Sequence, residues 1–199
     1  MTQPTLILAS ASPRRTQLLA QIGVTFAQAP QEIDETPAKG ESAMALAQRL
    51  ALEKARAAYA AQDQSDFIVL GSDTVVVTGD AILGKPENAD DALQMLALLS
   101  NRSHRVCTGV SLVSGNRSAS RLSVTEVSFR EIELKEAQAY WETGEPQGKA
   151  GAYAIQGLGA VFVEQISGSY SGVMGLPLYE TAQLLAEFGM PILSPSGAS

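Results

Sequence analysis

The stretch that decides the fold is LILASASPRRTQLLAQIG, residues 6–23. An apolar run at residues 6–9 is typical of a buried strand, and small residues follow it. Ser12 is a favourable N-cap, Pro13 suits the first helical position, and Gly23 stands where a helix would end. The sequence therefore predicts a strand, a tight turn and a helix within 18 residues.

Two arginines, Arg14 and Arg15, occupy the first turn of this expected helix. The helix N-terminus already carries partial positive charge, so two further cations there are unfavourable unless an anion is bound. Backbone N–H groups, guanidinium groups and the hydroxyl of Ser10 would converge on such an anion. The alternative is a solvated pair that points outward, and a phosphate-sized ligand is the better explanation.

Composition limits the classes of partner. The 199 residues carry a net charge of -7, which disfavours broad binding to nucleic acid or to an anionic membrane. Cys107 is the only cysteine, and no secretory signal or apolar run of membrane-spanning length is visible. These features predict a soluble cytoplasmic protein that binds a small anion through a local cluster of cations.

The order of elements predicts an α/β fold with a mixed sheet and flanking helices. Strands and helices alternate early, and a hairpin with its turn at Gly115-Asn116 comes later. We expect a single domain, 1–199, with two lobes that meet near residue 100 around a cleft, and a frayed tail at 191–199. The expected elements include helices from Ser42, over 88–104, 133–146 and 175–189, and strands over 66–86 and within 159–173.

Carboxylates supply the next candidates. Asp73 lies in the apolar stretch FIVLGSDTVVV, where a buried carboxylate is costly unless it is paired, hydrogen-bonded or bound to a metal. The alternative is an aspartate that caps a turn at a strand end. Asp34 and Glu35 could complete an oxygen-only site for Mg²⁺ or Mn²⁺, although such a pair is more often a solvated turn.

Three lysines and a glutamine complete the set. Lys54 lies in a helical pattern and would by itself be read as a surface lysine, whereas Lys85 lies in a restrained loop and Lys149 opens a glycine-rich stretch. The amide of Gln156 can donate and accept at once, which suits the edge of a base, and its alternative is a structural hydrogen bond.

Two common nucleotide-binding motifs and a Cys–His nucleophile pair are not supported by the sequence. It contains no GxxxxGK[ST] phosphate loop, and GLGAVF lacks the third glycine of a dinucleotide fingerprint. His104 and Cys107 are three residues apart on a strand pattern, so we expect them on opposite faces of the sheet.

Four segments together resemble the Maf family of nucleotide pyrophosphatases: LASASPRRTQLL, GSDTVV, LGKP and KAGAYAIQGLG. They occur in the family's order at compatible spacing, and the resemblance extends from Leu6 to about Phe188. It implies a mixed α/β fold related to the inosine-triphosphatase type, dependence on a divalent metal cation, and often a homodimer. The implied reaction cleaves a nucleoside triphosphate between the α and β phosphates, giving a monophosphate and pyrophosphate.

The resemblance also implies roles for individual residues. The family's proton acceptor corresponds to Asp73, and its loop carboxylate to Glu35, so these two are the candidate metal ligands. Whether Asp73 is the base or a ligand, and whether Glu35 binds the metal directly, stays open. The implied phosphate-binding residues are Ser10, Arg14, Arg15, Lys54 and Lys85.

Three positions resemble the members that act on dTTP and UTP, namely Arg14, Thr74 and Gln156. In the members that act on 7-methyl-GTP, the first motif resembles SPWRR instead, glutamine follows the aspartate, and glutamate stands in the later motif. A 7-methyl-GTP pyrophosphatase and a nucleotide-binding regulator of septum formation are the alternative functions.

Overall fold

A mixed sheet of seven strands forms the centre of the protein, in the order β2-β1-β3-β5-β6-β7, with β4 paired to β3. The computed structural model describes residues 5–62 and 67–193. β1 pairs with β2 and β3 in parallel, and the other pairings are antiparallel. The strands are β1 (Thr5–Leu8), β2 (Phe26–Gln28), β3 (Phe67–Thr78), β4 (Ala81–Leu83), β5 (Ser103–Ser114), β6 (Arg117–Phe129) and β7 (Val163–Ser167).

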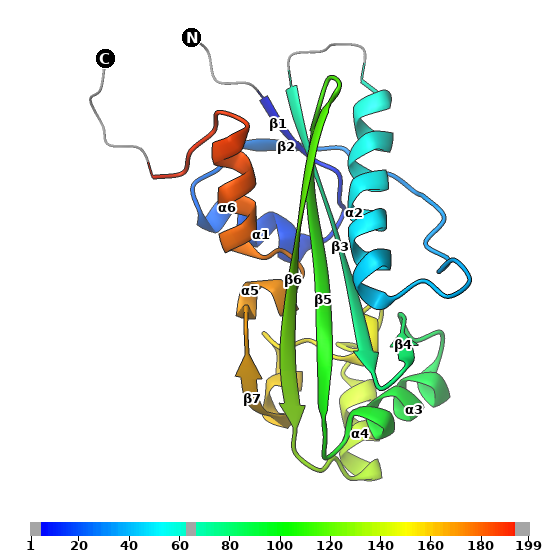
Figure 1. Ribbon diagram of the computed structural model, residues 1–199. Helices are drawn as coiled ribbons and strands as arrows, with labels where there is room; N and C mark the ends of the chain where they lie inside the picture. The colour runs from blue at the N-terminus through cyan, green and yellow to red at the C-terminus, as the bar shows by residue number, and fades with distance from the viewer. Residues whose placement is uncertain (1–4, 63–66, 194–199) are drawn as a thin grey trace.

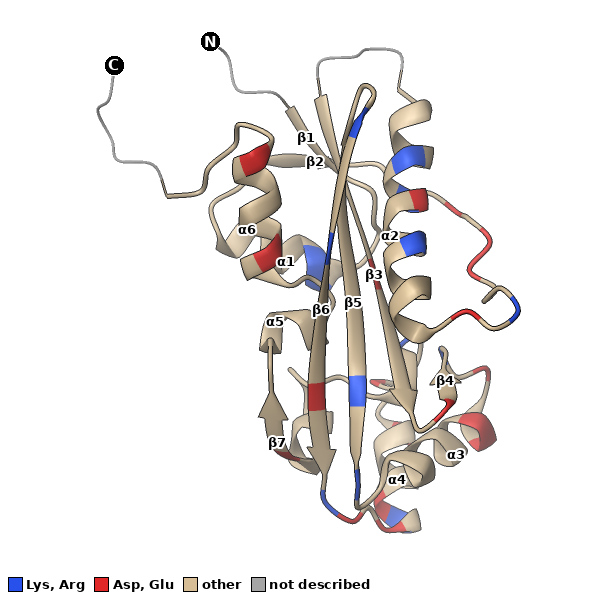
Figure 2. Ribbon diagram, in the orientation of Figure 1, with Lys and Arg blue, Asp and Glu red and all other residues tan. Residues whose placement is uncertain are grey.

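Helices flank both faces of this sheet (Figure 1). They are α1 (Pro13–Gln21), α2 (Ala43–Ala60), α3 (Ala89–Leu99), α4 (Leu134–Glu142), α5 (Tyr170–Met174) and α6 (Leu178–Glu187), with two 3-10 helices, η1 (Ala150–Ala152) and η2 (Leu158–Phe162). The predicted mixed α/β fold is thus confirmed. Charged residues lie mostly on helices and loops, and the long strands contain few of them (Figure 2).

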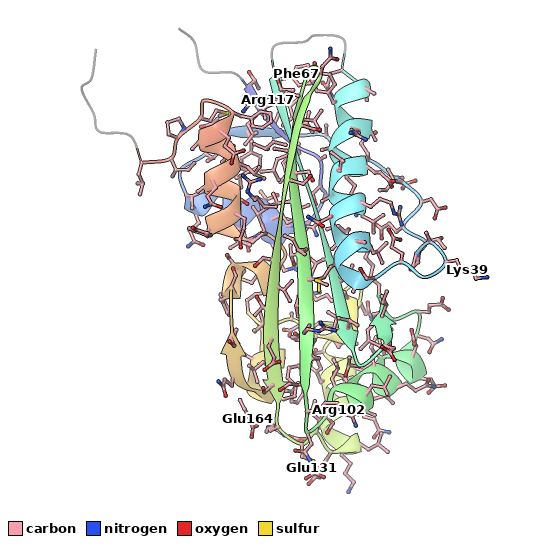
Figure 3. The ribbon with its side chains drawn as sticks, viewed as in Figure 1. Lys39, Phe67, Arg102, Arg117, Glu131 and Glu164 are labelled. Atoms are coloured by element: carbon pink, nitrogen blue, oxygen red, sulfur yellow. The ribbon has the colours of Figure 1, made fainter. Side chains whose placement is uncertain are left out.

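Three long strands, β3, β5 and β6, run along the molecule. Phe67 and Arg117 lie at one end, and Arg102 and Glu131 lie at the other (Figure 3). Alternate residues of each strand face opposite sides of the sheet, so one strand can serve two separate layers.

One face of the sheet is covered by α2, which packs closely on β3 and β5. Glycines make this approach possible: a Cβ on Gly71 would lie 2.2 Å from the carbonyl oxygen of Ala51, and one on Gly109 would lie 2.3 Å from that of Ala47. The alanine-rich side of α2 fits the same need, because small side chains let the helix backbone come close to the strands. The packing of α2 therefore explains why a glycine stands at position 71 of β3.

The other face carries two hydrophobic clusters at different positions along the long strands. The first joins α1 and α6 to Leu6, Leu8, Ile68, Leu70, Val110 and Leu112. The second joins α3, α4 and η1 to Val76, Val106, Val127 and Phe129. On β3, Ser72 and Thr74 lie between these clusters, so the polar interval falls where the two apolar layers separate. Both β3 and β5 contribute residues to both clusters. The expected division into two lobes that meet near residue 100 stays a prediction.

The strand-like run expected over 159–173 is shorter than predicted. Its first residues form η2, its middle forms β7, and its last residues form α5. Gly168, with φ +132°, ends the strand, and Ser169 caps α5 by accepting a hydrogen bond from the backbone N–H of Gly172. Of the expected tail, residues 194–199 lie outside the described residues. Within 5–62 and 67–193, no helix is long and apolar enough to cross a bilayer.

Candidate functional site

A cavity of about 1050 Å³ opens at an unpaired edge of β3. β1 pairs with β3 as far as Leu70, and β4 joins the same edge only from Val76. In the part of the chain that the structure describes, residues 71–75 therefore have no neighbouring strand on this side, and side chains from both faces of β3 reach the same cavity. Its volume is at the upper end of the ~300–1,000 Å³ typical of small-molecule sites.

With one exception, the candidate site residues named from the sequence border this cavity. The structure brings them together from the β1–α1 turn, the loop before α2, α2 itself, β3, the loop after β4 and the glycine-rich segment. They are Ser10, Arg14, Arg15, Glu35, Lys54, Asp73, Thr74, Lys85 and Gln156. Asp34 is the exception, since it does not line the cavity and its carboxylate accepts a hydrogen bond from the backbone N–H of Thr36.

The β1–α1 turn places two arginines in different surroundings. Arg15 donates to the carbonyl oxygen of Gly175 at 2.8 Å, to Ser10 Oγ at 3.2 Å and to Thr74 Oγ1 at 3.4 Å. Burial lowers the pKa of Arg15, and the nearby carboxylate of Asp73 opposes that effect. Arg15 therefore ties the turn to β3 and to the residue after α5.

Arg14 has no hydrogen-bond or ion-pair partner within the part of the chain that the structure describes. Burial lowers its pKa, and Lys149 is close enough that the charge of Arg14 adds to burial in lowering the pKa of Lys149. Lys149 also lines the cavity and donates to the carbonyl oxygen of Gln147 at 3.2 Å. Two neighbouring cations are favourable at a site that receives an anion.

Four charged side chains form what we call the ion-paired cluster: Glu35, Lys54, Asp73 and Lys85. Lys54 Nζ lies 2.6 Å from Asp73 Oδ1 and 2.5 Å from Glu35 Oε1, and Lys85 Nζ lies 3.3 Å from Glu35 Oε2. The side chains of Lys54 and Asp73 are only 10% and 11% exposed. Burial would raise the pKa of Glu35, but Lys54 and Lys85 outweigh it and lower that pKa.

Lys54 is thus buried on the side of α2 that faces the sheet, contrary to its local interpretation as a surface lysine. The reason is the close contact between α2 and β3 at Gly71, which places the helix directly over the Asp73 side of the strand. An ammonium group in this position remains favourable because two carboxylates pair with it. Its spacing does place it on the apolar side of α2, since Leu50 and Ala51 precede it by four and three residues, but the local sequence does not show that carboxylates face this position.

The ion-paired cluster fits a divalent metal ion only if a bound substrate supplies further oxygen ligands. Within residues 5–62 and 67–193, no three His, Cys, Asp or Glu side chains come together to hold an ion. Asp73 and Glu35 reach the same ammonium group, so they are near each other, and Mg²⁺ commonly binds one or two carboxylates together with substrate phosphates. The donor set fits such an ion.

The side chains of Thr74 and Gln156 differ in whether they are hydrogen-bonded to the rest of the described chain. Thr74 Oγ1 lies within hydrogen-bonding distance of Arg15 Nη2 and Thr108 Oγ1. The side chain of Gln156 is exposed and makes no hydrogen bond to any described residue. Its alternative reading, a structural hydrogen bond to a loop, therefore finds no support in this part of the chain.

Sequence reasoning missed Tyr153 as a wall of the cavity. Its hydroxyl lies 2.9 Å from His104 Nε2, and burial lowers the pKa of His104 to about 4. His104 and Cys107 belong to clusters on opposite faces of the sheet, as their spacing predicted. An aromatic residue in a glycine-rich segment was the only available signal for Tyr153.

Comparison with known proteins gives consistent results. A family described as Maf-like protein matches residues 5–188. The dTTP/UTP pyrophosphatase of Alkalilimnicola ehrlichii is 53% identical over 190 residues, 94% of each chain. Those of Pseudoalteromonas atlantica and Hahella chejuensis are each 50% identical, covering 93% and 95% of this chain and 97% and 94% of their own.

Among solved structures, the Staphylococcus aureus Ham1 protein aligns with a TM-score of 0.43 and 15% identity, covering 65% of this chain and 72% of that chain. That score does not by itself establish a shared fold. The family match spans nearly all of the described residues, and the relatives are similar over almost their full lengths. This chain belongs to the Maf family.

Proposed function

We propose that this protein hydrolyses nucleoside triphosphates, with dTTP and UTP preferred, between the α and β phosphates. Water adds to one phosphorus, the bridging P–O bond breaks, and the products are a nucleoside monophosphate and pyrophosphate. The observation that carries the proposal is the meeting of the arginine turn, Asp73 and two lysines in one cavity. Relatives at about half identity are named dTTP/UTP pyrophosphatase.

The cations of the cavity would bind the phosphates. A triphosphate brings about four negative charges, which are costly to desolvate unless cations offset them. Arg14, Arg15, Lys54 and Lys85 supply that charge in a chain whose net charge is -7, and the hydroxyl of Ser10 adds a donor. The N-terminus of α1 adds backbone N–H groups at the same end of the cavity.

Asp73 would act as the proton acceptor. Its carboxylate is held at a fixed position by Lys54 and borders the cavity, so it can take a proton from an attacking water. In this role Lys54 orients the carboxylate, and Glu35 holds Lys54 from the other side. Each of these groups is in place before substrate arrives.

A divalent cation, Mg²⁺ or Mn²⁺, would be held by Asp73 and Glu35 together with phosphate oxygens. When bound, such an ion neutralises phosphate charge and acidifies water. Lys54 and Lys85, which pair with the same two carboxylates, would lie beside the phosphates and offset their charge.

Base recognition would fall to Arg14, Thr74 and Gln156. The free amide of Gln156 can donate to and accept from the edge of uracil or thymine. We further propose that the enzyme is a cytoplasmic homodimer that binds neither nucleic acid nor membranes. A buried free thiol, Cys107, suits a reducing compartment. Light scattering of the purified protein should give twice the 20.9 kDa mass of one chain.

Product analysis with and without Mg²⁺ tests the reaction. We expect pyrophosphate from UTP and dTTP, loss of turnover with excess EDTA, and recovery when Mg²⁺ or Mn²⁺ is restored. Release of orthophosphate as the first product would contradict the proposed bond cleavage.

A panel of UTP, dTTP, GTP and 7-methyl-GTP tests the base preference. We expect kcat/KM to be at least about tenfold higher for UTP and dTTP, the ratio of one well-placed polar contact. Equal rates on 7-methyl-GTP would favour the other subgroup. An inactive variant that still blocked septation in cells would favour the regulator.

A further inference from the structure

The carboxylate of Glu145 is folded inward onto the backbone of the glycine-rich segment. Its Oε2 accepts a hydrogen bond from the backbone N–H of Leu158 at 2.9 Å, and its Oε1 accepts one from that of Gly159 at 3.0 Å. The hydroxyl of Tyr140 donates to the same Oε1 at 2.7 Å. Two successive amides and a phenol thus surround one carboxylate, which is the geometry of a small anion-binding nest.

The segment from Ala154 to Gly159 is held at both ends by these two side chains. Tyr140 Oη, which donates to Glu145, also accepts a hydrogen bond from the backbone N–H of Ala154 at 3.0 Å. Gly157 is required by the contact, since a Cβ there would lie 2.2 Å from Glu145 Oε2. Gly159 is required too, because its Cβ would lie 2.6 Å from Tyr140 Oη.

Gln156 lies in the middle of this clamped segment. Its neighbours Ala154 and Leu158 are both bonded through their backbone N–H groups, while its own side chain makes no hydrogen bond to a described residue and borders the cavity. The backbone on either side of Gln156 is therefore fixed, although the amide itself is free to meet a ligand.

Near neutral pH, the charge states of Glu145 and Tyr140 favour their hydrogen bonds to each other and to residues 154–159. Burial opposes ionisation of Glu145, but the backbone N–H of Gly159, the Tyr140 hydroxyl and the backbone N–H of Leu158 outweigh it and lower the pKa of Glu145. Burial and the hydrogen bond to Glu145 raise the pKa of Tyr140, so its hydroxyl stays a donor.

We propose that Glu145 is a positioning residue for base recognition, which holds residues 154–159 so that the amide of Gln156 faces the base of the bound nucleotide. The inference rests on the proposed function, in which Gln156 reads a pyrimidine. Glu145 itself does not border the cavity, so its effect passes through the loop.

Steady-state kinetics of six proteins tests this: the wild type, Glu145→Ala, Glu145→Gln, Gln156→Ala, the double variant of Glu145→Ala with Gln156→Ala, and the control Glu142→Ala. Glu142 ends α4 on the exposed surface nearby. For Glu145→Ala we expect the ratio of kcat/KM for UTP to that for GTP to fall about tenfold, mainly through a higher KM for UTP. Glu142→Ala should keep the wild-type ratio, and Glu145→Gln should restore part of it because its amide oxygen still accepts one backbone hydrogen bond.

The double variant separates positioning from general stability. If Glu145 acts through Gln156, adding Glu145→Ala to Gln156→Ala should leave the ratio unchanged. An equal loss on UTP and GTP, or a further fall of the ratio in the double variant, would overturn the proposal. Should Glu145→Ala fail to fold, Tyr140→Phe and Glu145→Gln are judged by the same ratio.

Hydrogen exchange of the backbone amides of Leu158 and Gly159 gives a readout without substrate. We expect faster exchange at both positions in Glu145→Ala than in Glu142→Ala. Unchanged exchange would show that Glu145 does not hold these two amides, and would overturn the proposal. If the wild type shows no preference for UTP, the proposed function fails, and hydrogen exchange still tests whether Glu145 holds residues 154–159. If the preference is present and Glu145→Ala leaves it intact, only the present inference fails.

Discussion

The ion-paired cluster and the pair formed by Arg14 and Gln156 border the same cavity but are held in different ways. Lys54 and Asp73 are nearly buried, and each lies within 2.6 Å of an oppositely charged partner. Arg14 and Gln156 have no hydrogen-bond partner in residues 5–62 and 67–193. The first region is organised before a ligand binds, whereas the second waits for one.

This difference suggests a division of labour. Chemistry benefits from groups that are fixed beforehand, because no reorganisation is then needed during the reaction. Recognition can use groups whose hydrogen-bonding capacity is unspent, because a ligand that satisfies them is favoured over one that does not. Variants in the two regions should therefore change different kinetic constants.

The largest effect is expected in the ion-paired cluster. Asp73→Asn should lower kcat for UTP about 10³-fold, since the amide is not a useful proton acceptor, while its oxygen can still accept a hydrogen bond from Lys54. Circular dichroism should show an unchanged fold. Asp34→Asn is the matched control, because Asp34 is an exposed carboxylate one residue from Glu35 and does not line the cavity. A near-normal rate for Asp73→Asn would remove Asp73 from the chemistry.

An intermediate effect should separate the two adjacent arginines. Arg14→Ala should raise KM for UTP about tenfold with little change in the midpoint of urea unfolding, because Arg14 has no hydrogen-bond or ion-pair partner among residues 5–62 and 67–193. Arg15→Ala should instead lower the free energy of unfolding by about 2 kcal/mol, since it leaves the carbonyl oxygen of Gly175 with one donor fewer. If Arg14→Ala were the destabilising variant, the comparison between the two regions would break down.

The smallest effect concerns pH and the loop carboxylate. The pKa of Glu35 in the folded protein is lowered from 4.5, so the unfolded chain binds its proton first as pH falls. The stabilisation from Glu35 is therefore complete at neutral pH and is lost as pH falls from about 4.5 through the lower folded value. Urea unfolding of wild type and Glu35→Gln should differ by a constant amount near neutral pH and by less in acid.

A second background checks the origin of that pH dependence. In Lys54→Met, the difference made by Glu35→Gln should depend less on pH, because the main partner of the carboxylate is gone. An undiminished pH dependence in that background would assign the effect to Lys85 or to the loop rather than to the ion-paired cluster.

Much of the fold follows from local signals. The strand and helix of residues 6–23, the long helix after Ser42 and the hairpin at Gly115-Asn116 all occur near their predicted places. Each depends on a short-range pattern of apolar spacing, caps and turn residues. The segment 159–173 was predicted less well, because Gly168 and Ser169 divide it within a few residues.

By itself, the sequence determined the residue types of the candidate site and the order of its motifs along the chain. Only the tertiary structure decided that Lys54 is buried between two carboxylates, that Arg15 rather than Arg14 is hydrogen-bonded among the described residues, and that Glu145 accepts hydrogen bonds from the backbone that follows Gln156. The reason is that burial and pairing are set by contacts between segments distant in the chain. The approach of α2 to β3 at Gly71 creates one such contact: helical spacing puts Lys54 on the apolar side of α2, but only this approach brings it to Asp73.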